Sequence, residues 1–171
     1  MNIKPEQLQN HLSNQPASLY FAFGSEILLV EQSLTTIKDA AKKLGFDERF
    51  RFDIDGNFSW DAIFNLISSP SLFADKRIIE CRLTTGKIGV KGSKALSELT
   101  ENLPDDIMLI ISSGKLDIAQ QKSKWFKALD KKGVIIQHWE VQSEQLVGWI
   151  VNHMSQLGLS SSNEVANAIA Y

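Results

Sequence analysis

Cysteine is nearly absent from this chain, because Cys81 is the only one among 171 residues. A single thiol excludes a disulfide framework and a metal site built on cysteines, and it is typical of a protein of the reducing cytoplasm. The three histidines, at positions 11, 138 and 153, do not have the spacing of metal ligands. We therefore expect neither a bound metal nor any other cofactor.

Long apolar runs are also missing from the sequence. No stretch approaches the roughly twenty apolar residues that a membrane-spanning helix needs. Residues 1–5 lack the apolar segment of a signal peptide. We expect a cytoplasmic protein without membrane contact, which at this length buries a sufficient core without covalent cross-links.

Basic residues are unevenly placed along the chain. Residues 76–132 hold twelve of the eighteen lysines and arginines, whereas residues 133–171 hold none, and the net charge is −2. The basic stretch has two interpretations, a surface that faces an anionic partner such as DNA or a set of solvated helix faces. Trp125 and Phe126 lie among its lysines, and they are either core residues or a platform for stacking bases.

The apolar pattern predicts an α/β fold. Helical stretches with apolar residues at every third or fourth position, clearest at 27–44, separate short apolar runs that are typical of strands. The predicted strands are residues 18–23, 49–53, 76–83, 107–112 and 134–139. This alternation predicts a parallel five-stranded sheet flanked by helices.

Several boundaries follow from local signals. Residues 2–14 are predicted as a short amphipathic helix and residues 84–93 as a loop. Ser25, Ser59 and Asp117 are predicted helix caps. From residue 143 the pattern becomes helix after helix, so we expect an α/β domain over residues 1–140 and the beginning of a small helical domain over residues 141–171.

The first predicted strand leads into an incomplete phosphate-binding loop. Gly24 and Ser25 lie where a P-loop would lie, but the pattern G-x-x-x-x-G-K-[ST] requires further glycines and a lysine. Glu26 instead places negative charge there, and the fourth strand ends at Ser112 and Ser113 without an acidic pair for magnesium. We therefore expect a degenerate nucleotide loop at Gly24 and Ser25, no ATP hydrolysis and no catalytic residues.

Between the predicted helix that Ser59 caps and the third predicted strand, the chain reads Ser-Pro-Ser-Leu-Phe-Ala-Asp over residues 69–75. Ser69 precedes a proline, which disfavours the helical region for it. Leu72 and Phe73 are adjacent, so on one helical turn their directions differ by about 100°. They form either a hydrophobic wedge for a partner or a plug at the edge of the core.

Several stretches together resemble a known family. They are residues 4–8, 19–26, 60–64, 71–77, 114–117 and 125–129, in an order and spacing similar to those of the delta subunits of bacterial DNA polymerase III, which are clamp-loader subunits. The resemblance implies an AAA+/RecA-like P-loop-type fold without a working nucleotide site. It also implies that Ser71, Leu72 and Phe73 form the clamp-binding element, with Pro70 and Asp75 at its rim.

The same resemblance implies the partners of the chain. They are the sliding clamp (the beta subunit), other clamp-loader subunits held through a C-terminal part that is not in this sequence, and primed DNA within the assembly. Subunits of this family belong to a DNA-directed DNA polymerase holoenzyme, a nucleotidyltransferase, in the bacterial replisome. In the family, a helical middle domain and a collar domain follow the α/β domain.

Two other functions fit the residues alone. One is a P-loop-like nucleotide-binding enzyme with an unconventional site, for which tight, magnesium-dependent ATP binding is expected. The other is a DNA-binding module that uses the basic stretch, for which strong, salt-sensitive affinity for DNA is expected.

Overall fold

The structure is a computed structural model that describes residues 1–69 and 74–170, with the side chain of residue 156 left out. The chain divides into two compact units, Met1–His138 and Trp139–Tyr171. Each unit is described separately below.

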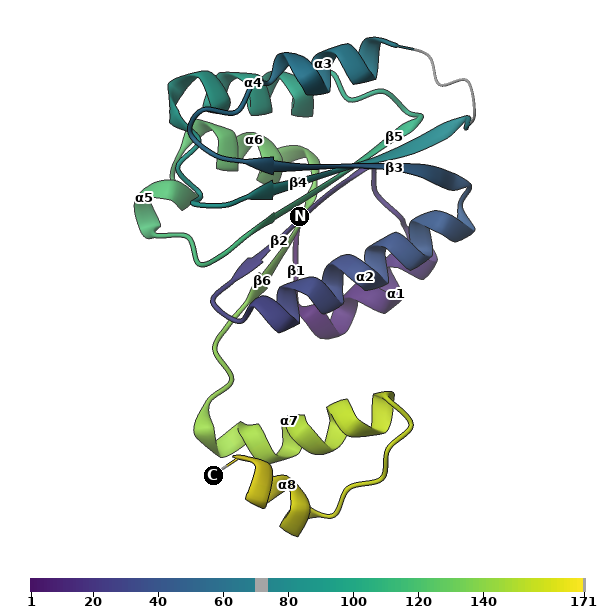
Figure 1. Cartoon of the computed structure of the whole chain (residues 1–171), viewed down its shortest axis with the longest axis vertical. Helices are drawn as coiled ribbons and strands as arrows, with labels where there is room; N and C mark the ends of the chain where they lie inside the picture. Colours follow the sequence, from purple (N-terminus) through teal and green to yellow (C-terminus); the bar gives the residue numbers. More distant parts are fainter. Residues whose placement is uncertain (70–73, 171) are drawn as a thin grey trace. The chain divides into compact units, whose positions relative to one another are not determined.

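The first unit is built on a sheet that has six strands in the described part of the chain, and all of its strand pairs are parallel. The strand order is β1-β6-β2-β5-β4-β3 (Figure 1). The strands are β1 (Asn2–Ile3), β2 (Leu19–Gly24), β3 (Phe46–Ile54), β4 (Lys76–Leu83), β5 (Ile107–Ser113) and β6 (Val134–His138). The predicted parallel α/β sheet is confirmed, with one strand more than expected.

Helices cover both faces of this sheet (Figure 1). On one face lie α1 (Leu8–Asn14) and α2 (Ile27–Lys43), and on the other lie α3 (Asp61–Ser68), α4 (Gly89–Glu101), α5 (Ile118–Gln121) and α6 (Lys124–Lys132). Every residue of β2 is buried, with Phe21 in the core beneath α3, α4 and α6 and Tyr20 in the core beneath α1 and α2. Alternate residues of a strand point to opposite faces, which explains the continuous apolar run.

Trp125 belongs to this core. Its side chain is only 4% exposed, and its ring centroid lies 5.9 Å from that of Phe21. Phe126 is partly buried against the same cluster. The core interpretation is therefore confirmed for Trp125, and Phe126 packs against the same core through contacts with the rings of Phe21 and Phe23.

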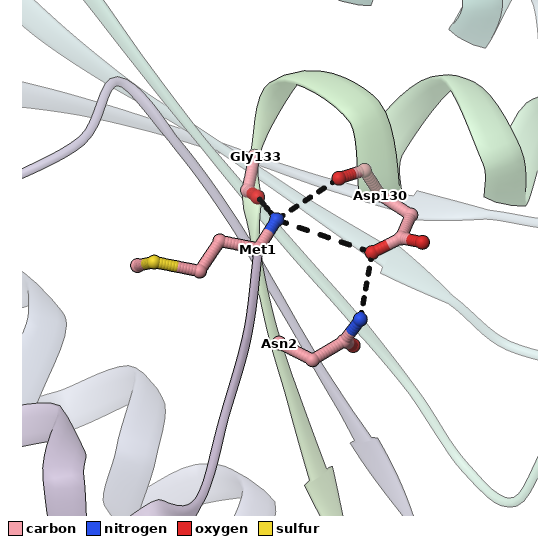
Figure 2. Close-up of polar contacts among 4 residues, drawn as sticks. All are labelled: Met1, Asn2, Asp130 and Gly133. Atoms are coloured by element: carbon pink, nitrogen blue, oxygen red, sulfur yellow. Dashed lines mark hydrogen bonds and ion pairs between the residues drawn. The ribbon is translucent and has the colours of Figure 1, made fainter.

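The predicted helix over residues 2–14 is wrong in its first part. Asn2–Ile3 is strand β1, which pairs with β6, and a 3-10 turn (η1, Pro5–Gln7) precedes α1. Figure 2 shows why the first residues are held there: the α-ammonium group of Met1 donates to the carbonyl oxygens of Asp130 (3.0 Å) and Gly133 (2.7 Å). Asn2 Nδ2 also donates to Asp130 Oδ1 at 2.9 Å. These groups satisfy carbonyls at the end of α6.

Helix boundaries differ from the predictions at several caps. The N-cap of α2 is Glu26 rather than Ser25, and that of α3 is Trp60 rather than Ser59. Asp117 caps α5 as predicted, but α5 ends after one turn and Ser123 caps a separate helix, α6. Helix α4 begins inside the loop expected over residues 84–93.

The second unit contains α7 (Ser143–Gln156) and α8 (Asn163–Ala170), which contact each other. Gly158 lies between them with φ of 75°, a left-handed conformation that glycine adopts without strain. Ala166 is fully buried. In neither unit does the described part of the chain include a helix that is both long and apolar enough to span a membrane.

Candidate functional site

The predicted clamp-binding residues Ser71, Leu72 and Phe73, together with Pro70, lie outside the described residues. The structure describes both flanks of this segment. Helix α3 ends at Ser68, and Ser69 follows with an extended backbone (φ −93°, ψ 126°), as expected for a residue before proline. Asp75, the other predicted rim residue, is exposed.

Arg77 connects the two flanks, and the sequence analysis did not identify it. Its guanidinium Nη1 donates to the carbonyl oxygens of Leu66 (2.8 Å) and Ser69 (2.9 Å), which end α3. Its Nη2 lies 3.6 Å from Asp106 Oδ2, and its backbone N–H donates to the Asp106 carbonyl oxygen at 2.9 Å. The side chain is only 5% exposed, so a buried cation joins α3, β4 and the turn before β5.

Lys76 anchors the same end of β4 to the start of β3 and to the residue that follows α2. Its Nζ donates to the Leu44 carbonyl oxygen at 3.1 Å and lies 5.2 Å from the centroid of the Phe46 ring. Of the described residues that flank residues 70–73, residues 68, 69, 75 and 76 are exposed and residue 74 is partly buried. The described flanks therefore lie mostly at the surface.

At the predicted degenerate nucleotide loop, the packing of β2 against β6 explains why position 24 is a glycine. Gly24 is the last residue of β2 and pairs with His138 of β6. A Cβ atom at Gly24 would clash with the His138 carbonyl oxygen and would lie 2.7 Å from His138 Cβ. Close packing of two strands therefore requires glycine here, and Ser25 follows it without capping α2.

A cleft of about 340 Å³ opens at the carboxyl ends of the strands. In parallel α/β sheets, ligands commonly bind at this edge. The cleft is lined by Ile27, Val30, Glu31, Asp53, Arg82, Leu83, Thr84, Ser112, Ser113 and Gly114. This lining includes two acidic residues and one arginine but no lysine among the described residues.

Two buried titratable residues of the sheet, His138 in β6 and Cys81 in β4, do not form a reactive site. His138 Nε2 lies 3.0 Å from Ser33 Oγ, and burial lowers the pKa of His138, an effect that Glu6 partly offsets. Burial raises the pKa of the Cys81 thiol far above its usual range, so the nucleophilic thiolate is disfavoured. Within the described residues, no group of three or more His, Cys, Asp or Glu side chains has the geometry to hold a metal.

Seven of the ten lysines of residues 76–132 lie near one end of the α4–α6 layer. Helices α4 and α6 contact each other, and a Cβ at Gly86 would lie 2.7 Å from Leu116 Cδ2, so the turns before α4 and α5 are adjacent. Crossover helices in a parallel sheet begin at the carboxyl edge. Seven exposed lysines are therefore near this end: Lys87, Lys91, Lys94, Lys115, Lys122, Lys124 and Lys127, called the basic surface below.

Comparisons with known proteins agree with this architecture. Residues 20–138 match the family model described as DNA polymerase III, delta subunit. The chain is 30% identical to DNA polymerase III subunit delta of Escherichia coli K12 over 171 residues, which cover 100% of this chain and 50% of that protein. It is also 30% identical to the Haemophilus influenzae subunit over 172 residues, covering 99% of this chain and 50% of that protein.

A solved structure supports the fold independently. The Bacillus subtilis DNA clamp loader delta protein superimposes with a TM-score of 0.66 at 16% identity, covering 95% of this chain and 50% of that one. This likeness confirms the fold, a parallel sheet flanked by helices. The chain spans about half the length of the curated relatives that it matches, and it belongs to the family of DNA polymerase III delta subunits.

Proposed function

We propose that this chain carries the clamp-binding element of a bacterial clamp-loader subunit that acts in DNA replication. The element consists of Ser71, Leu72 and Phe73, with Pro70 and Asp75 at its rim. The observation that carries the proposal is the place of this segment in a delta-subunit chain: it lies between α3 and β4, and the flanking residues Ser69 and Asp75 are exposed. In this proposal, the two adjacent large apolar residues of the segment bind the partner.

The energy of binding comes from burial of this pair. Transfer of each side chain into an apolar pocket contributes roughly 1.5–3 kcal/mol, and such central apolar anchors are typical hot spots of protein interfaces. A sliding clamp whose closed interface is disfavoured in the bound conformation then shifts toward the open ring. In this proposal, the chain opens the clamp through differential binding and hydrolyses no ATP itself.

The same proposal includes further partners and a location. Other clamp-loader subunits are held through the part of the relatives that this chain does not span, and primed DNA enters the complete assembly. The protein acts in the cytoplasmic replisome. No catalytic residue or cofactor is assigned to this chain.

Titration of the cognate clamp with the chain and with the variant Leu72→Ala, Phe73→Ala tests the proposal. We expect the variant to lose clamp binding, because it removes most of the apolar area, and to keep its unfolding midpoint. Ile27→Ala, Leu28→Ala is the matched control, since these adjacent residues are 60% and 53% exposed on α2. Equal affinity of all three proteins for the clamp would refute the assignment.

A DNA-binding function is the second candidate, and the basic surface favours it. Asp117 is the only acidic residue between Lys115 and Lys127, and none lies between Lys87 and Lys94. Each lysine that contacts a phosphate releases counterions, so removing it reduces the salt dependence of the affinity by about one power of concentration. Fluorescence anisotropy with primed DNA, comparing the chain with Lys91→Ala, Lys124→Ala, measures this slope, and an unchanged slope excludes the basic surface as a DNA site.

The nucleotide-binding alternative is tested by adding ATP and magnesium. The cleft at the carboxyl edge is large enough for a ligand, but its lining presents Glu31 and Asp53 to any phosphate group. We therefore expect no tight, magnesium-dependent ATP binding by calorimetry. Tight binding would favour the enzyme and would contradict the proposed mechanism.

A further inference from the structure

Burial of a cation at the start of strand β4 has a cost in free energy that requires explanation. The Arg77 side chain is 5% exposed, and moving a charged group out of water is expensive unless hydrogen bonds and an opposite charge compensate. Asp106, its acidic partner, is itself 48% exposed, and Arg77 Nε has no hydrogen-bond partner among the described residues. Compensation is therefore incomplete, so stability alone gives a weak reason for an arginine here.

The strongest contacts of Arg77 go to the end of α3. The carbonyl oxygens of Leu66 and Ser69 accept from one nitrogen, Nη1, at 2.8 and 2.9 Å. Carbonyls in the last turn of a helix lack partners within the helix and carry the negative end of its dipole. A guanidinium satisfies two of them at once, which a lysine ammonium with a single nitrogen does with less fixed geometry.

These contacts join the two described flanks of residues 70–73. Ser69 follows the end of α3, Lys76 begins β4, and Arg77 donates directly to the Ser69 carbonyl oxygen. The backbone of Arg77 is in turn fixed to Asp106 at 2.9 Å and to the sheet through its pairing with Ile107. The Arg77 side chain therefore holds Ser69, and with it the end of α3, at a fixed distance from the start of β4 in the sheet.

We propose that Arg77 is a positioning residue for clamp binding: its guanidinium fixes the end of α3 against the start of β4, which are the two described flanks of the clamp-binding element. This inference rests on the proposed function of Leu72 and Phe73. Fixing the attachment points before binding lowers the conformational cost of the complex. Arg77 itself need not contact the clamp.

The test uses Arg77→Met and Arg77→Lys. Methionine fills a similar apolar volume and removes the buried charge, so the fold is retained, but it donates no hydrogen bond to α3. Lysine keeps the charge and restores one donor group. Arg51→Lys is the control, because it makes the same chemical change in β3, where the guanidinium lies 3.6 Å from Asp53.

Two readouts separate positioning from general stability. The first is amide hydrogen exchange: in Arg77→Met we expect residues 66–69 and 74–77 to exchange at least about tenfold faster, while β2 and β5 remain protected. The second is clamp affinity, which we expect to fall about tenfold if the competent geometry drops to a tenth of the population. Arg77→Lys should recover part of both effects, and Arg51→Lys should change neither.

A combined variant shows whether Arg77 acts through the apolar pair. If it does, Arg77→Met weakens binding much less when added to Phe73→Ala than when made alone. Fully additive losses, or unchanged exchange at residues 66–69 and 74–77, would overturn the inference. If Leu72→Ala, Phe73→Ala binds the clamp normally, then the proposed function fails instead, and the exchange result still decides whether Arg77 holds the two flanks.

Discussion

Two buried charges of opposite sign lie three residues apart in strand β4 and face opposite sides of the sheet. Arg77 is 4% exposed and faces α3, whereas Glu80 is 3% exposed and lies 3.6 Å from Lys38 of α2. Neither was singled out from the sequence, because their partners are carbonyls and side chains of other elements. Residue identity within a strand predicts burial poorly when the compensating group is contributed by tertiary packing.

His138 makes the stability of the fold depend on pH. Burial lowers its pKa below the ordinary value of about 6.5, so the folded protein holds this ring neutral beside Ser33 at pH values where the unfolded chain already binds a proton. Stability is therefore complete above about pH 6.5 and falls as the pH decreases below that value, by at most about 1.4 kcal/mol per pH unit.

Urea titrations at several pH values measure this dependence. We expect the free energy of unfolding of His138→Gln to fall less between pH 7 and pH 5 than that of the unsubstituted chain. His11→Gln is a useful control, because burial also lowers the pKa of His11 and its separate contribution is then known. Identical pH dependence of the chain and His138→Gln would show that this histidine is not linked to folding.

At the scale of elements, β2 and β6 approach so closely at Gly24 that the position tolerates no side chain. Gly24→Ala forces the new Cβ against the His138 carbonyl group, and overpacking of this kind typically costs about 1–3 kcal/mol. Gly114→Ala is the control, since a Cβ there would meet no atom within 4 Å in the described structure, and its expected change is within about 0.5 kcal/mol. Thermal unfolding distinguishes the two, and equal midpoints would mean that the strand contact does not require glycine.

The elements that the sequence predicts best are those with long, repeated patterns. The buried strand β5 and the long helix α2 are nearly as expected, because each carries a continuous apolar run or a stripe at helical spacing. Strand β1 is missed because two residues show no periodicity and their pairing with β6 depends on the distant Asp130 and Gly133. The split between α5 and α6 is missed because Ser123 acts as a second cap inside one apolar pattern.

At the scale of the whole molecule, the fold and the family assignment agree. The order of motifs predicts a delta-subunit fold, and the family match over residues 20–138 confirms the family. The predicted clamp-binding residues 71–73 remain a prediction, because they lie outside the described residues. The structure shows that Arg77 bridges the two flanks of this segment, a contact between distant residues that the sequence pattern alone does not reveal.

The most direct test of the account is a hydrogen-exchange footprint of the cognate clamp on this chain. The proposal predicts that bound clamp slows amide exchange in residues 69–76, while α2 and the basic surface keep their exchange rates. Protection confined to α2, or to α4 and α6, with residues 69–76 unchanged, would contradict the claim that the clamp binds through Leu72 and Phe73.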